Sequence, residues 1–223
     1  MVLSAIICGH SFCKRLQVDM QAGTDARMRP SFKLEETARV RMLGKGGKTM
    51  GDFVRRDIPV IQRYRPEILI LLLGDNDIGC DTSAEEIANH LIALASRLYM
   101  GGHVSRIVLC QMMPRSRAPR AAQRRMGGVT RRNADRYLLS YGQQAQEANR
   151  LLKEAASSSR FLTFWDHNKK FRFIKVGQSQ EGKFAADGIH LAPRGQYQLY
   201  KSLRGALPCA SRSLAVQRKQ LRN

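Results

Sequence analysis

The sequence predicts an α/β fold in which helices flank a parallel sheet. Three observations lead to this expectation: short apolar runs, segments with helical spacing of apolar residues, and a regular alternation of the two along 223 residues. Runs that are apolar throughout are typical of parallel strands, because helices cover both faces of such a sheet. A hydrophobic content of 43% is enough to bury the core of one domain.

Five segments have the character of strands. They span residues 3–9, 38–43, 67–74, 104–112 and 160–166. The third is the clearest, because six consecutive apolar residues precede Gly74. The second alternates polar and apolar residues, so we expect it to lie nearer an edge of the sheet.

A segment with helical periodicity follows each strand. These segments span residues 11–20, 49–64, 82–100, 130–156 and 192–207. Pro59 is expected to shorten or kink the second helix, Thr82 or Ser83 to cap the third, and Gly142 to mark a break in the fourth. Strand and helix alternating five times predict a three-layer α/β/α sandwich. Its five-stranded doubly wound parallel sheet should have the flavodoxin-like strand order.

The chain is strongly basic, with 38 Lys and Arg against 18 Asp and Glu and a net charge of +20. Such a balance indicates a polyanionic partner, the alternative being charge carried for solubility. We expect one domain over residues 1–207, an Arg-rich loop insertion at 113–132 and a basic C-terminal tail at 208–223. The residues expected to contact nucleic acid or another polyanion are Arg115, Arg117, Arg120, Arg124, Arg125, Arg131 and Arg132. Aromatic residues do not interleave with these arginines, so binding would use phosphates rather than stacked bases.

Five cysteines occur, an odd number: Cys8, Cys13, Cys80, Cys110 and Cys209. Most lie in or beside apolar runs, where reduced buried thiols are expected. Cys8, His10 and Cys13 do not complete a four-ligand zinc set, so we expect no metal. No apolar run approaches 18 residues and the first lacks a basic leader, which predicts a soluble, intracellular protein, cytoplasmic or nuclear.

Polar or glycine-rich segments that could take part in catalysis or binding follow the first three strands. Ser11 comes after a strand and a glycine turn, where its hydroxyl would be exposed and its N–H free at a helix N-terminus; the alternative is a simple N-cap. Asn76 follows the third strand, where its amide could point into a cleft or merely form the loop. The "GKGGKT" segment allows backbone N–H groups to approach a ligand, although it lacks the spacing of a phosphate loop.

Asp187 and His190 stand three residues apart just before the last predicted helix. An imidazole can take a proton from a hydroxyl, and a nearby carboxylate can fix its tautomer and support its cation. The alternative is an ordinary solvated pair.

Together these blocks resemble the SGNH hydrolase superfamily, also called GDSL-type lipases and esterases. The blocks are "GHS" at 9–11, "GKGG" at 44–47, "GDND" at 74–77 and "DGIH" at 187–190, and the resemblance covers roughly residues 1–207. It implies that Ser11 is the nucleophile, His190 the general base and Asp187 its orienting partner. It further implies an oxyanion hole made of the Ser11 N–H, the Asn76 amide and an N–H of Gly47, with Gly44 or Gly46 as alternatives.

One departure from the family pattern is His10, where the family has Asp before the nucleophile. The resemblance implies a serine esterase that hydrolyses a carboxylic ester in a small or lipid-like substrate, without metal or cofactor. The alternative is a degenerate site on a module that binds nucleic acid or acidic membrane. Motifs and charge also resemble the esterase domain found in the first open reading frame of some LINE-type animal retrotransposons.

Overall fold

The computed structural model describes residues 2–79, 82–173 and 182–220. Five parallel strands form one sheet in the order β2-β1-β3-β4-β5. Their bounds are Leu3–Gly9 for β1, Ala38–Gly44 for β2, Ile68–Leu72 for β3, Arg106–Cys110 for β4 and Leu162–Trp165 for β5. The fold class, the strand order and the edge position of β2 predicted from the sequence are confirmed.

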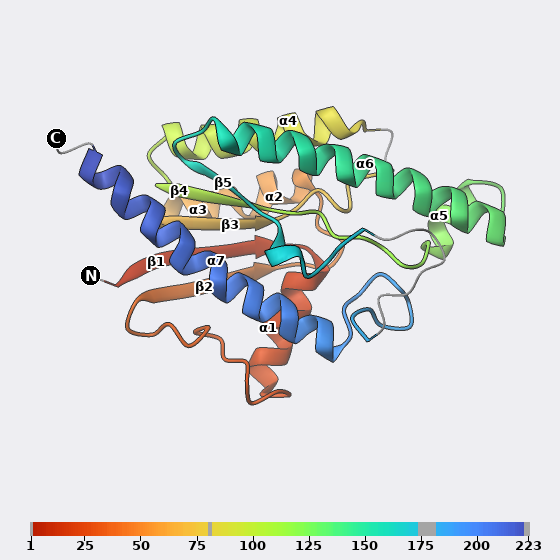
Figure 1. Ribbon diagram of the computed structural model, residues 1–223, viewed down its shortest axis with the longest axis horizontal. Helices are drawn as coiled ribbons and strands as arrows, with labels where there is room; N and C mark the ends of the chain where they lie inside the picture. Colours follow the sequence, from red (N-terminus) through yellow and green to blue (C-terminus); the bar gives the residue numbers. More distant parts are fainter. Residues whose placement is uncertain (1, 80–81, 174–181, 221–223) are drawn as a thin grey trace.

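Helices cover both faces of the sheet (Figure 1). Helices α1 (Ser11–Ala22) and α7 (Pro193–Gln220) pack on one face. Helices α2 (Met50–Arg56), α3 (Ile58–Tyr64), α4 (Ala84–Met100) and α6 (Arg131–Ser157) pack on the other. Short helices α5 (Arg120–Arg125) and η1 (His167–Lys169) lie in the connections.

Strand β1 shows how the sequence divides the core in two. Ile6 and Cys8 point to the core under α2, α3, α4 and α6, whereas Ala5 and Ile7 point to the core under α1 and α7. A strand with side chains buried on both faces has to be apolar throughout, which explains the continuous runs in the sequence.

Three helices differ from expectation. The helix predicted at 49–64 is two helices, because the chain turns at Asp57 and Pro59 enters the first turn of α3. Helix α6 runs unbroken through Gly142. Helix α7 continues through Pro208 and buries Ala210 and Leu214, so the described part of the expected basic tail is helical.

Three cysteines, Cys8, Cys13 and Cys110, are buried free thiols, and Cys209 is free and half-buried; Cys80 lies outside the described residues. Burial raises the pKa of Cys13 to about 12, which keeps this thiol protonated and unreactive. Among the described helices, none is both long enough and apolar enough to cross a bilayer.

Candidate functional site

The loops after β1, β2 and β3 meet at the carboxyl end of the sheet. Gly9 lies in register with Gly44 on β2 and with Leu72 on β3. Beyond the strands, Lys45 N donates to the Gly9 carbonyl at 3.1 Å, and His10 N donates to the Leu72 carbonyl at 3.3 Å. The three sequence blocks at 9–11, 44–47 and 74–77 are therefore neighbours in space.

Ser11 is the first residue of α1 and is half-buried. The close approach of this helix to β2 requires Gly44, since a Cβ there would lie 2.4 Å from Lys14 N and 2.5 Å from Lys14 Cα. Gly44 is therefore explained by packing, whereas Gly47 lies exposed in the following turn with a φ of +64° that suits glycine.

Lys48 ties this turn to the core. Its side chain is buried, and Nζ donates to the Leu43 carbonyl at 2.7 Å and to Asp57 Oδ2 at 2.6 Å, with Cys8 Sγ 3.3 Å away. Burial would lower the pKa of Lys48, but its neighbours Cys8 and Asp57 raise that pKa overall. Its backbone carbonyl accepts a hydrogen bond from Asn76 Nδ2 at 3.0 Å. The anchored turn thereby orients the Asn76 amide.

His10 forms a buried pair with Asp75. Nε2 of His10 lies 3.0 Å from Asp75 Oδ2, and the two residues are 3% and 4% exposed. The other oxygen, Oδ1, accepts from Met113 N at 2.9 Å and lies 3.2 Å from the Tyr141 hydroxyl. Burial would raise the pKa of Asp75, but the charge and hydrogen bond of His10 and the Met113 N–H hold it below the ordinary value. The residue that departs from the family pattern thus has its own acidic partner.

Asp187 and His190 are in direct contact. Oδ2 of Asp187 lies 2.6 Å from Nδ1 of His190, while Oδ1 accepts from the backbone N–H groups of Ile189 at 2.9 Å and of His190 at 2.8 Å. Burial would raise the pKa of Asp187, but these hydrogen bonds outweigh it and lower the pKa to about 2. Asp187 is therefore a carboxylate at neutral pH, and it directs the Nε2 atom of the imidazole away from itself.

Arg115 and Ser116 join the Asp187–His190 loop to the loop after β3. Ser116 N donates to the Gly188 carbonyl at 2.8 Å. Its neighbour Arg115 donates through Nη2 to the Asp75 carbonyl at 2.9 Å and lies 3.5 Å from Asn76 Oδ1. A segment of two residues therefore spans from one candidate loop to the other.

Core packing brings the same loop toward α1. Phe12, next to Ser11, and Leu191, next to His190, are both buried in the core on the α1 and α7 face. Figure 1 shows the loop before α7 lying beyond the arrowheads of the strands. The five predicted site residues thus lie at the start of α1 and on loops at the carboxyl end of the sheet, and their catalytic roles remain predictions.

Sequence reasoning missed Lys48, Asp75 and Arg115 as residues that hold together the loops at the carboxyl end of the sheet. Lys48 and Asp75 lie inside the quoted "GKGGKT" and "GDND" blocks, which was the available signal. Their partners are 9 and 65 residues away, respectively, and local spacing does not reveal such contacts.

Comparison with known proteins identifies relatives of the chain. The model of the GDSL-like lipase/acylhydrolase family matches residues 9–197. No curated protein sequence matches the chain.

Solved structures share the fold at low sequence identity. A GDSL-like lipase from Bacteroides thetaiotaomicron is 14% identical with a TM-score of 0.66, over 93% of this chain and 88% of that one. A lipase/acylhydrolase from Enterococcus faecalis is 12% identical with a TM-score of 0.58, over 92% and 95%. A catalytic mutant of an acetylxylan esterase from Geobacillus stearothermophilus is 14% identical with a TM-score of 0.57, over 90% and 92%.

Proposed function

Because the chain belongs to the GDSL-like lipase/acylhydrolase family, we propose that it is a serine esterase that hydrolyses a carboxylic ester through an acyl-enzyme. The observation that carries this proposal is the 2.6 Å contact between Asp187 and His190. An ionised carboxylate bound to Nδ1 leaves the imidazole with Nε2 as the atom that can accept a proton. The loop that bears the pair is hydrogen-bonded to Ser116, and the neighbouring Arg115 contacts Asp75 and Asn76.

In the proposed reaction, the Ser11 hydroxyl attacks the ester carbonyl while its proton passes to Nε2 of His190. The tetrahedral intermediate collapses, the bond from carbon to the alcohol oxygen breaks, and the imidazolium returns the proton to the departing alcohol. Water then attacks the acyl-enzyme, again losing a proton to His190, and releases the acid and free Ser11. Asp187 stabilises the imidazolium in both halves of the cycle.

Three donors are suited to stabilise the oxyanion. The Ser11 N–H lies at the N-terminus of α1, where the aligned peptide dipoles favour negative charge. The Asn76 amide is oriented by its bond to the Lys48 carbonyl, and the Gly47 N–H belongs to the turn that Lys48 anchors. Donors held in place before the reaction need little reorganisation when charge develops.

The substrate we propose is a small or lipid-like ester. The solved structures with this fold include a protein titled a lipase and one titled an acetylxylan esterase, so both acyl lipids and acetylated sugars are suitable first probes. We further propose that the protein works inside the cell, because three of its cysteines are buried as free thiols.

The test is covalent labelling combined with turnover. We expect a fluorophosphonate probe to label the wild-type protein, and we expect Ser11→Ala to lose both labelling and at least about 10³-fold of its activity on 4-nitrophenyl acetate. The matched control is Ser158→Ala at the exposed end of α6, which should keep both. Undiminished activity of Ser11→Ala, or a wild-type protein that neither reacts with the probe nor hydrolyses the ester, would refute the proposal.

A further inference from the structure

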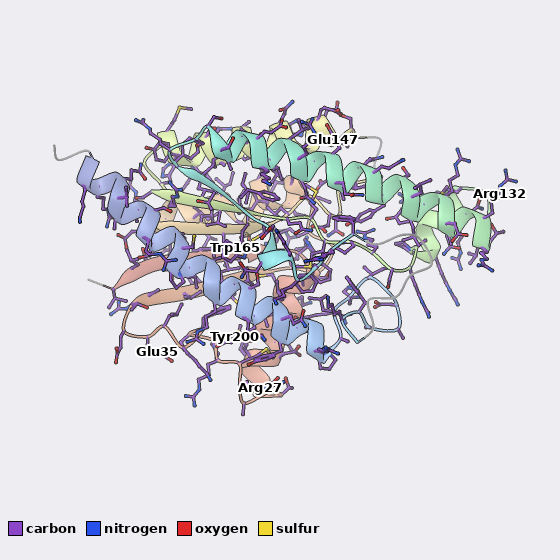
Figure 2. All side chains as sticks on the ribbon, in the orientation of Figure 1. Arg27, Glu35, Arg132, Glu147, Trp165 and Tyr200 are labelled. Atoms are coloured by element: carbon purple, nitrogen blue, oxygen red, sulfur yellow. The ribbon has the colours of Figure 1, made fainter. Side chains whose placement is uncertain are left out.

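The Arg-rich segment forms a projecting arm, which we define as residues 115–136. It contains a short stem (residues 115–119), helix α5 and the start of α6. Figure 1 shows α5 and the start of α6 extending past the rest of the fold, and Figure 2 shows Arg132 at the outer end. The arm therefore presents most of its arginines to solvent.

The charge on this arm is almost entirely positive. It holds eight arginines, no lysine and one acid, Asp135, so its net charge is eight minus one, or +7. The exposed arginines are Arg117, Arg120, Arg124, Arg125, Arg131, Arg132 and Arg136. Among the described residues, the ion pair on this arm is the one between Arg131 and Asp135, at 4.0 Å with both side chains exposed. Such a pair neutralises little of the field.

Hydrogen bonds give the arm a defined shape. Thr130 caps α6 by accepting from Asn133 N at 3.1 Å, and Asn133 Nδ2 donates to the Gly128 carbonyl at 2.8 Å. The buried amide of Gln123 donates to the Ala118 carbonyl at 2.9 Å. The arginines are thus displayed on an ordered scaffold, which lowers the entropic cost of binding a partner.

The stem joins the arm to the candidate site. Ser116 and Arg117 donate through their backbone N–H groups to the Gly188 carbonyl, at 2.8 and 3.3 Å. Gly188 itself has no room for a side chain, since a Cβ would lie 2.5 Å from Arg117 Cγ. The positive surface therefore begins directly beside the loop that carries Asp187 and His190.

We propose that this arm binds the phosphate backbone of nucleic acid without regard to sequence. The planar guanidinium donates two parallel hydrogen bonds to a phosphate, and an arm that uses arginine alone suits this geometry. The adjacent pairs Arg124–Arg125 and Arg131–Arg132 present two such groups at each position.

The observations favour nucleic acid over a membrane surface. A helix that lies in a lipid interface needs a broad apolar face with Leu, Phe or Trp beside its basic face. Among the described residues of the arm, Val129 is the large hydrophobic side chain that is exposed, at 53%. A phosphate polymer requires no apolar face, because counterion release supplies the binding free energy.

The experiment compares two charge-reversal variants of the full chain that have the same net charge. The arm variant is Arg124→Glu/Arg125→Glu/Arg132→Glu. The control variant is Arg97→Glu/Lys153→Glu/Arg212→Glu, at exposed positions on α4, the far end of α6 and α7. Binding of a fluorescein-labelled single-stranded RNA of mixed sequence is measured by anisotropy over a series of salt concentrations.

We expect the wild-type affinity to fall steeply with salt. The arm variant should bind at least about tenfold more weakly, with the slope of log Kd against log salt reduced by about 2, since each phosphate contact contributes about 0.7. The control should keep the wild-type slope and an affinity within about threefold of wild type. Circular dichroism of the three proteins verifies that the helices remain formed.

Two results would overturn the proposal. Equal losses in the arm and control variants would show that bulk charge, rather than the arm, attracts the RNA. Flotation of the wild-type protein with phosphatidylserine-containing vesicles, together with no RNA binding, would assign the arm to membranes instead. Neither measurement involves turnover, so the outcome is independent of the proposed esterase activity.

Discussion

Substitution of His10 by Asp tests how the buried pair under the first loop works. This change restores the residue that the family carries before its nucleophile, so a reading of motifs alone predicts an improvement. The structure predicts the opposite. Nε2 of His10 lies 3.0 Å from Asp75 Oδ2 with both residues almost fully buried, so the variant would place two carboxyl groups face to face.

The expected loss is large compared with the stability of a typical domain. Leaving a buried carboxylate without its hydrogen-bonded partner costs about 3–5 kcal/mol, out of a total of about 5–15 kcal/mol. Like charges at short range also raise the pKa of one carboxyl in the folded His10→Asp variant above its unfolded value near 3.9. The folded state then binds more protons than the unfolded state. The stability of this variant should therefore fall as pH rises above about 4, by up to about 1.4 kcal/mol per pH unit until the folded pKa is reached.

Urea unfolding at pH 5 and pH 8 measures both effects. His10→Asp should be less stable than wild type at both values, and it should lose more stability than wild type between pH 5 and pH 8. The companion variant His10→Asp/Asp75→Asn removes the like charge and keeps an oxygen that can accept from Met113 N, so it should regain stability and lose the added pH dependence. A His10→Asp protein within about 0.5 kcal/mol of wild type at both pH values would refute the reasoning.

Three further predictions concern other parts of the fold. Lys48→Met leaves Asp57 without its buried partner and should lower the free energy of unfolding by about 3–5 kcal/mol in urea titration. Asn76→Ala should remain folded by circular dichroism but lower kcat for ester hydrolysis by about 10²–10³-fold, because it removes one of the proposed oxyanion donors. Burial lowers the pKa of His167 to about 4, below its unfolded value of 6.5, so the folded state resists protonation. The shift contributes about 3 kcal/mol to the free energy of unfolding above pH 6.5, and this contribution is lost as pH falls to about 4. Between pH 7 and pH 4, wild type should therefore lose about 3 kcal/mol more of its free energy of unfolding than His167→Gln, when both proteins are unfolded at the two pH values.

Much of the architecture could be predicted because it depends on local pattern. The run before Gly74 is the clearest strand prediction, and β3 is indeed the central strand with every side chain buried. The contact between Asp187 and His190 was also accessible, because three residues of spacing and a glycine turn bring the two side chains together. These features require no knowledge of which strands are neighbours.

The contacts that escaped prediction depend on sheet register. His10 reaches Asp75 because Gly9 lies opposite Leu72, and a shift in the pairing of β1 with β3 would separate them. The continuation of α7 past Pro208 escaped for a different reason. Proline argues against a helix interior locally, but burial of Leu214 favours the continued helix.

Two buried pairs, His10–Asp75 and Lys48–Asp57, are linked to the groups proposed to stabilise the oxyanion. The His10 pair adjoins Ser11, and the Lys48 pair anchors the turn whose carbonyl orients Asn76. Well-packed apolar residues are generally as stabilising as a buried ion pair. Fold stability alone therefore does not explain why these pairs are present at the carboxyl end of the sheet. We therefore expect the two pairs to position the proposed oxyanion donors.

The double variant Lys48→Met/Asp57→Leu separates the effect of the pair on the position of the turn from its effect on the free energy of unfolding. Replacing both charges removes the cost of a lone buried carboxylate, so the free energy of unfolding should return to within about 1.5 kcal/mol of wild type. The hydrogen bond from Nζ to the Leu43 carbonyl is lost, however, and with it the anchor of the turn. Ester hydrolysis should consequently stay about tenfold or more below wild type, mainly in kcat, because a donor shifted by a fraction of an ångström stabilises the transition state less well. Recovery of both stability and kcat in this variant would show that the pair contributes to folding alone.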